Sequence, residues 1–295
     1  MKKIILLGIC FLFNSLLWAA PELDQSWGKI TQSCQTVPSP KHVWLFKQWH
    51  LGPKTNTFLD QDFAKLPQEK NQTAIYLQIA KWIENKQMEY VFAEGCQDNE
   101  LNEKSSLTIN GWNISSLQKL KDSNNYSQIV SSVPLKLEAK FTAAVKTFCG
   151  DDLALIEKNA LAFSDARAGS GFLSRIGQFK KDDKSLTRYL DAAREAYKLP
   201  PNASKDAVVK HIVTKLKTAV ASIQKYVEAR NQILIKKVLA QKASDLVIVF
   251  GGMHTPGLIK GLEDSKINCS VVTPVGYQDN ETELLSSLKT AVGKL

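Results

Sequence analysis

Apolar residues gather in short unbroken runs near the start of the chain. The runs at 42–46 and 90–93 are each typical of a buried strand, and residues 71–87 between them place apolar side chains four apart, as one face of a helix requires. A strand, a helix and a second strand in this order form a βαβ unit, whose two strands are parallel.

The same alternation returns near the end of the chain. Residues 245–250 form a β-branched run, and a helix that continues through residue 262 follows at once. A further strand at 269–273 and a helix from about residue 281 complete the pattern. We therefore predict an α/β fold, with a mixed or mostly parallel sheet built from both ends of the chain.

The middle of the chain predicts helices and no strand. Three helical segments are expected in it, at 134–148, 152–166 and 184–197. Gly169 and Gly171 are expected to break the chain between helices, and a long helix is expected over 204–242. We interpret residues 97–200 as a helical insertion, or cap, over one edge of the sheet, within a single domain of residues 21–295.

The first twenty residues are typical of a secretory signal peptide. A basic start, an apolar run over residues 4–17 and the small pair Ala19-Ala20 predict cleavage before Pro21 or Glu22. The apolar run is short for a membrane span, and no later stretch approaches eighteen apolar residues. We expect an exported protein, periplasmic or secreted, with no stable membrane span after cleavage; a retained anchor and a lipoprotein attached at Cys10 are weaker alternatives.

Composition places the chain among ordinary globular proteins. Of its 295 residues 44% are apolar and 23% are charged, which excludes collagen-like, low-complexity and wholly disordered classes. The formal net charge is +9, and loss of Lys2 and Lys3 leaves +7. Lysines and arginines are interleaved with apolar residues along helices and form no compact patch with aromatic residues, so we expect no nucleic-acid partner.

Cysteine usage agrees with export. Loss of Cys10 leaves an even set: Cys34, Cys96, Cys149 and Cys269. One or two disulfides are expected among them, and the three possible pairings stay open. A zinc site is disfavoured because none forms a CxxC pair. Cys96 could be a nucleophile beside Glu94, but half of a disulfide is the favoured interpretation.

Three polar residues stand at or just beyond the ends of predicted strands: His50, Glu94 and His254. Sites in open α/β sheets form at this edge, and two imidazoles with a carboxylate are a common ligand set for divalent metals. The pair Gly251-Gly252 before His254 lets the backbone approach a ligand closely. His50 as a surface loop residue and Glu94 as a cap of its turn are the alternatives.

Arg230 falls on the apolar stripe of the long helix. A buried guanidinium requires a partner, which could be Glu94 or a substrate carboxylate; an arginine that reaches solvent at a helix bend is the alternative. Asn231 could support the site or be exposed. In the insertion, a cleft could be lined by Asp165, Arg167 and Arg175.

Several catalytic motifs are absent from the sequence. It contains no GxSxG, no HExxH, no Walker loop, and no GxGxxG after the first predicted strand. This disfavours a serine hydrolase, a zincin and a nucleotide-binding protein.

Residues 228–262 resemble the C-terminal signature of the Tiki/TraB superfamily, which includes the ChaN-like haem-binding proteins. The resemblance rests on Arg230-Asn231 in a helix, then a strand, the turn Gly251-Gly252-Met253-His254 and a helix. Glu94 matches a glutamate after the second strand of the family. His50 matches the histidine of a first Gly-x-x-His motif, in which Lys47 replaces the glycine.

The resemblance implies a metal-dependent hydrolase, possibly a peptidase of the Tiki type acting on a peptide or protein substrate. His50, Glu94 and His254 would then surround a divalent ion (Mn, Zn or Co), Arg230 would steady an oxyanion or orient Glu94, and Gly251 and Gly252 would approach a ligand. Haem or small-ligand binding of the ChaN type is one alternative. The other is a non-catalytic relative that binds a partner protein, which Lys47 favours.

Overall fold

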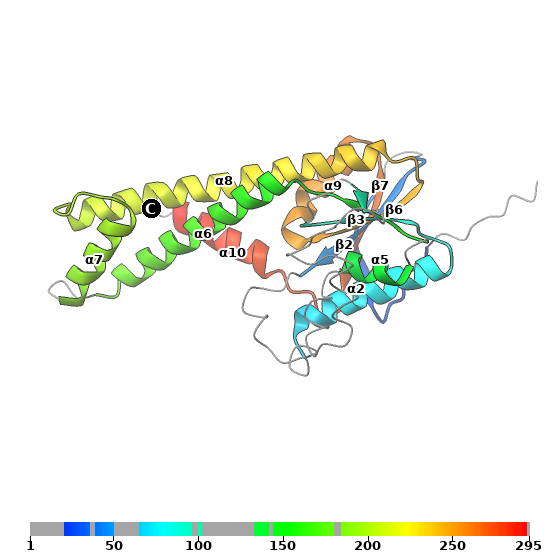
Figure 1. The fold of residues 1–295 in the computed structure, drawn as a ribbon, viewed down its shortest axis with the longest axis horizontal. Coiled ribbons are helices and arrows are strands. Elements are labelled where there is room, and N and C mark those ends of the chain that lie inside the picture. The colour runs from blue at the N-terminus through cyan, green and yellow to red at the C-terminus, as the bar shows by residue number, and fades with distance from the viewer. Residues whose placement is uncertain are drawn as a thin grey trace, which may run out of the picture.

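A computed structural model of the protein describes residues 21–35, 39–49, 65–95, 100–101, 133–141, 144–179 and 184–293. It is an α/β structure in which one sheet lies at one end and long helices extend from it (Figure 1). The strand order is β1-β7-β2-β6-β3-β5-β4. The strands are β1 (Gly28–Cys34), β2 (His42–Gln48), β3 (Tyr90–Ala93), β4 (Glu100–Leu101), β5 (Lys146–Cys149), β6 (Asp245–Gly251) and β7 (Asn268–Pro274).

The central strands of the sheet are parallel. β7, β2, β6, β3 and β5 pair in parallel, whereas β1 and β4 pair antiparallel with β7 and β5. Gln48 at the end of β2 is in register with Gly251 at the end of β6, and Ala93 at the end of β3 is in register with Val249. The predicted fold class is confirmed, and β2, β6 and β3 end side by side at one edge of the sheet.

Helices cover both faces of the sheet. The helical elements are α2 (Pro67–Glu84), α5 (Val133–Phe141), α6 (Leu153–Ile176), α7 (Lys184–Ala196), α8 (Lys205–Ala240), the 3-10 turn η2 (Gly252–His254), α9 (Thr255–Asp264) and α10 (Asn280–Gly293). Along β2, Trp44 and Phe46 pack with α2 and α5, whereas Val43 and Leu45 pack with α8 and α9. Because side chains alternate between faces, strands covered on both faces are apolar throughout.

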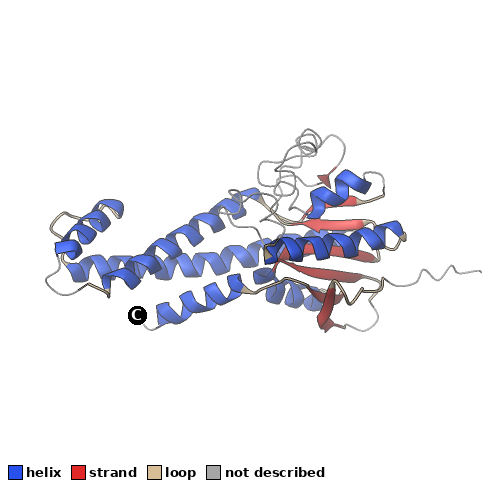
Figure 2. Cartoon of the chain, turned by 90° about the horizontal axis from the view of Figure 1, so that it is seen from below, coloured by secondary structure: helices blue, strands red, loops and turns tan. Residues whose placement is uncertain are grey.

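α6, α7, α8 and α10 form a helical arm that extends from the sheet (Figures 1 and 2). At 1.5 Å per residue, the 36 residues of α8 span about 54 Å. Two buried apolar clusters hold the arm together. The cluster nearer the sheet includes Ala166, Leu216, Ile223 and Leu288, and the distal one includes Phe172, Leu186, Leu190 and Ile212.

The middle of the chain differs from its prediction in two respects. The helix expected over 134–148 ends at Phe141, and residues 146–149 form strand β5 between β3 and β4, so the prediction of no strand there is wrong. Gly169 and Gly171 do not break the chain but lie inside α6. Gly169 faces Leu216 of α8, and tertiary packing of this kind outweighs the weak helix propensity of glycine. The helices predicted at 184–197 and 204–242 are confirmed as α7 and α8.

A disulfide joins Cys34 of β1 to Cys269 of β7, which lie opposite each other in the antiparallel register. Cys149 is also disulfide-bonded, and Cys96 lies outside the described residues. These bonds agree with the oxidising compartment that export implies. In the described part of the chain, no helix is long and apolar enough to cross a membrane.

Candidate functional site

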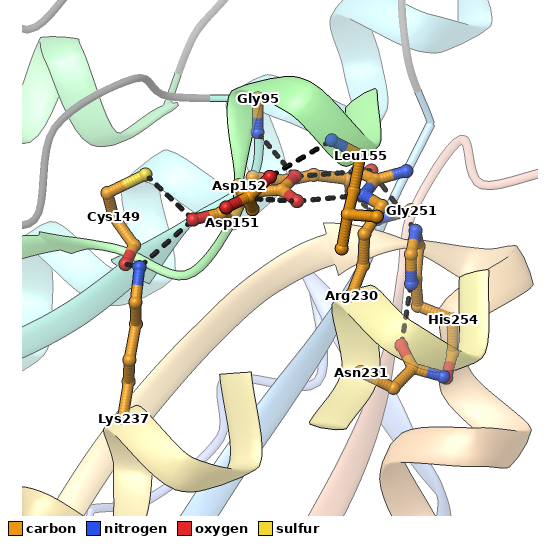
Figure 3. Close-up of polar contacts among 11 residues, drawn as sticks. Gly95, Cys149, Asp151, Asp152, Leu155, Arg230, Asn231, Lys237, Gly251 and His254 are labelled. Carbon is orange, nitrogen blue, oxygen red and sulfur yellow. Dashed lines mark hydrogen bonds and ion pairs between the residues drawn. The ribbon is translucent and has the colours of Figure 1, made fainter. Parts of the chain in front are cut away.

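Polar side chains from separate elements meet at the edge where the parallel strands end (Figure 3). Glu94 follows β3, His254 ends the η2 turn after β6, and Asp151 follows β5. Arg230 reaches this edge from α8. His50 follows β2, the other neighbour of β6, but position 50 lies outside the described residues.

Arg230 is the centre of the arrangement. Its Nη2 donates to Oε1 of Glu94 over 2.7 Å and to Oδ2 of Asp151 over 2.6 Å, and its Nε donates to Oδ1 of Asp151 over 2.8 Å. Burial alone would lower the pKa of Arg230, but the charges and hydrogen bonds of the two carboxylates raise it above its ordinary value. Of the two partners considered for Arg230, the structure shows Glu94, and the residue is only 5% exposed and so does not reach solvent at a helix bend.

Asp151 is a buried partner that the sequence reasoning missed. Besides Arg230, its carboxylate accepts from the backbone N–H groups of Gly95, over 3.2 Å, and of Asp152, over 3.0 Å. Nζ of Lys237 donates to the backbone carbonyls of Asp151 and Cys149, over 2.9 and 2.8 Å. Asp151 thus connects the turn after β3, the start of α6 and the inner face of α8.

Both carboxylate oxygens of Glu94 accept hydrogen bonds. Its Oε2 accepts from the backbone N–H of Gly251, while its Oε1 accepts from Arg230 and lies 3.4 Å from Nε2 of His254. Only 8% of the Glu94 side chain and 4% of the His254 side chain are exposed. The carboxylate therefore has a fixed orientation toward the imidazole.

The hydrogen bonds between His254 and Asn231 define the tautomer of the neutral His254 ring. The amide nitrogen of Asn231 lies 3.5 Å from the His254 carbonyl oxygen, and its Oδ1 lies 2.6 Å from Nδ1 of the ring. An amide oxygen only accepts, so Nδ1 carries the proton. In the neutral ring, Nε2 then presents a lone pair to Glu94. Two acceptors at this separation require a proton or a cation between them.

A cavity of about 390 Å³ opens beside these side chains. Glu94, Arg230 and His254 line one part of it, and one face of α6 lines another; its lining residues there are Asn159, Ala160, Phe163, Ser164 and Arg167. Met253 and Leu284 complete an apolar wall. Of the three insertion residues proposed for a cleft, Arg167 lines this cavity, whereas Asp165 and Arg175 are not among its lining residues in the described part of the chain.

The two glycines after β6 have structural partners. The Gly251 N–H holds Glu94, and a Cβ at Gly252 would lie 1.5 Å from the hydroxyl of Tyr277. Lys47, which stands where the resembled family has glycine, places its ammonium 5.6 Å from the centre of the Tyr277 ring. Gly252 therefore makes room for Tyr277, and neither glycine lines the described cavity.

Comparison with protein-family models, with curated proteins and with solved structures finds no match for the chain. The resemblance to the Tiki/TraB superfamily therefore stays a prediction. Among the described residues, no group of three or more His, Cys, Asp or Glu side chains could hold a metal ion. Glu94 and His254 are the described pair that could contribute two ligands, and the third predicted ligand, His50, lies outside the described residues.

Proposed function

We propose that the cavity beside Glu94 and His254 is the active site of an exported metal-dependent hydrolase that cleaves peptide bonds. The observation that supports this most directly is the contact of Oε1 of Glu94 with Nε2 of His254, which in the neutral ring are two acceptors, 3.4 Å apart at the wall of a cavity. A cation between them would convert this contact into an attractive one.

The geometry of the pair fits a metal ion. Two ligands that each lie about 2.1 Å from a tetrahedral ion are about 3.4 Å apart, and the described pair has this separation. The hydrogen bond from Nδ1 of His254 to Asn231 is the kind of outer contact that orients a metal-binding imidazole. Glu94 and His254 would therefore hold the ion, with His50 as the third predicted ligand.

The charge of the buried cluster also favours a cation. Glu94 and Asp151 share the guanidinium of Arg230, and the ammonium of Lys237 also lies beside Asp151, so Glu94 is the carboxylate with the fewer cationic partners. An uncompensated charge is costly when it is buried. A cation bound by Glu94 and His254 would give Glu94 a second positive partner beside Arg230.

The side chains that line the cavity would have separate roles in the reaction. A bound metal ion would supply an activated water and polarise the scissile carbonyl. Arg230 keeps Glu94 in place and lines the cavity, so its positive charge would stabilise an oxyanion that formed there. The apolar wall with Phe163 and Leu284 would exclude water and contact substrate side chains.

The first experiment is elemental analysis of residues 21–295, purified without a tag or chelator, alongside His254→Ala and His211→Ala. His211 lies on the arm near Tyr197 and is a matched control. We expect near-stoichiometric metal in the parent and in His211→Ala, little in His254→Ala, and metal-dependent cleavage of a peptide library by the parent. Absence of metal from the parent after incubation with manganese, zinc and cobalt would overturn the proposal.

A second candidate function is the binding of haem or another apolar ligand without turnover. It is favoured by one observation: Met253 and His254 both line the cavity, next to the apolar side chains of Phe163 and Leu284. Thioether and imidazole groups are common haem ligands. Titration with haem separates the two functions, because a Soret shift that is lost in His254→Ala would favour binding, and no shift at micromolar haem would exclude it.

A further inference from the structure

Positive charge is concentrated in one part of the molecule. Residues 153–240, which contain α6, α7 and α8, carry 17 lysines and arginines against 8 aspartates and glutamates, a net charge of +9. The whole chain also has a net charge of +9, and the chain without its predicted signal peptide has +7. The rest of the chain after residue 20 therefore contributes about −2, and residues 153–240 account for the basic character of the protein.

The outer side of α8 carries a row of lysines. Lys210, Lys217 and Lys225 are exposed, and at 3.6 residues per turn they fall within about 80° of one another around the helix axis. Lys215 is also exposed and lies about 80° further around the helix than Lys225. We refer to these four residues as the basic face. Figure 1 shows α6 and α10 on the inner side of α8, so no described element covers the opposite side.

The basic face has one acidic residue at each end, Asp206 one turn before Lys210 and Glu228 one turn after Lys225, and none between them. None of its four lysines forms an ion pair with a described residue, whereas Lys81, Lys140 and Lys260 elsewhere do. The sequence from 207 to 227 contains no acidic residue. Thr214 and Thr218 between the lysines donate to backbone carbonyls one turn earlier, over 3.0 Å each, so their hydroxyls lie against the helix.

The residue types on this face indicate the chemistry of its partner. Protein interfaces are rich in aromatic residues, methionine and arginine and poor in lysine, and single-stranded nucleic acids require aromatic side chains for stacking. The exposed positions from 205 to 225 contain no aromatic residue, methionine or arginine. A lysine ammonium is a hydrated point charge, which suits attraction to a charged surface without fixed contacts.

We propose that the basic face of α8 binds the surface of an anionic phospholipid bilayer. Lys210 and Lys225 are 15 residues apart, about 22 Å along a helix axis, so they can contact several headgroups of a flat membrane at once. Each lysine close to such a surface strengthens binding by about fivefold, and the attraction decays within a Debye length of about 8–10 Å. The arm would lie along the membrane surface without crossing it.

The test is co-sedimentation of residues 21–295 with vesicles. The probes are vesicles of mixed phosphatidylglycerol and phosphatidylcholine and vesicles of phosphatidylcholine alone, each at increasing salt. The variant is Lys210→Glu with Lys217→Glu and Lys225→Glu. The control reverses three exposed lysines outside the arm, Lys29, Lys70 and Lys242, and so changes the net charge by the same amount. Thermal unfolding of both triple variants verifies that they are folded.

We expect the parent and the control to bind the phosphatidylglycerol vesicles at low ionic strength and to dissociate as salt is added. The basic-face variant is expected to bind at least about a hundredfold more weakly, from about fivefold per lysine. Equal loss in both triple variants would show that net charge alone drives binding and would overturn the proposal. So would equal binding to phosphatidylcholine, or no binding of the parent at low salt, which would favour an acidic protein as the partner.

Discussion

Arg230 and Asp151 are 79 residues apart in the sequence and form a two-point ion pair in the interior, with Nε–Oδ1 and Nη2–Oδ2 distances of 2.8 and 2.6 Å. The Asp151 side chain is fully buried and that of Arg230 nearly so. The pair joins α8 to the end of β5 and leaves Arg230 in contact with Glu94. The orientation of Glu94 therefore depends on Asp151, a residue that is not among the described lining of the cavity.

Asp151→Ala is expected to destabilise the protein by about 3–5 kcal/mol, because it leaves the buried guanidinium of Arg230 with one fewer charge partner. The control is Asp152→Ala. Asp152 is the N-cap of α6 and accepts from the N–H of Leu155 over 3.0 Å, so its loss should cost about 1 kcal/mol. Urea denaturation of the three proteins measures the difference. Equal losses in both variants would show that the ion pair contributes no more than a helix cap.

The strands that can be predicted from the sequence are those buried on both faces. β2, β3, β6 and β7 are continuous apolar runs because helices cover both sides of the sheet, and each was predicted to within two residues at either end. β1 has polar and exposed side chains at an edge of the sheet, and its sequence has no comparable run. β5 has only four residues and directly follows a helical pattern, so the two were predicted as one helix.

The candidate site could be predicted where it follows a predicted strand. Glu94 and His254 follow β3 and β6. The position of Arg230 on the apolar stripe of α8 predicted that its side chain is buried. Asp151 was missed because no strand was expected to end before it. The available signal was a short stretch of β-branched and aromatic residues at 145–149, then Gly150 and two acidic residues, which is typical of a strand end followed by a helix cap.

Gly252→Ala tests the packing of the turn that supplies the Gly251 N–H. The added methyl group would lie 1.5 Å from the Tyr277 hydroxyl, so Tyr277 or the turn must move, at a cost of about 1–3 kcal/mol. Combining it with Tyr277→Ala should make the added cost of Gly252→Ala smaller than in the parent. Gly171→Ala is the control, since nothing lies within 4 Å of its Cβ position and a helix interior favours alanine. Similar melting temperatures for the two single alanine variants would contradict the packing.

Asp24→Asn tests a pH-dependent contact near the predicted cleavage site. Hydrogen bonds from the side chain and backbone of Ser26, together with Lys81, lower the pKa of Asp24 from 3.8 to about 2. The charged form is favoured by folding, so its stabilising effect is present above 3.8 and is lost as the pH falls toward 2. The variant should be less stable than the parent at neutral pH, and urea midpoints measured over a pH series should converge near pH 2. A gap that stays constant with pH would contradict this.

Arg167→Ala tests which end of a peptide the cavity receives, and it rests on the proposed hydrolase function. Arg167 is exposed, lines the cavity eight residues after Asn159 on the same helix, and forms no ion pair with a described residue. A substrate carboxylate near this guanidinium would gain up to about 1 kcal/mol, or about fivefold in affinity. We expect the variant to raise KM by this factor for peptides with a free C-terminal carboxylate, to leave kcat unchanged, and to have no effect on the matching C-terminal amides.

Arg175→Ala is the control, because Arg175 lies on the same helix but contacts the Tyr189 ring. Binding of the same carboxylate and amide peptides, measured by calorimetry without turnover, separates a wrong assignment of Arg167 from a protein that does not cleave peptides. Equal effects of Arg167→Ala on both kinds of peptide would show that the residue does not select a carboxylate.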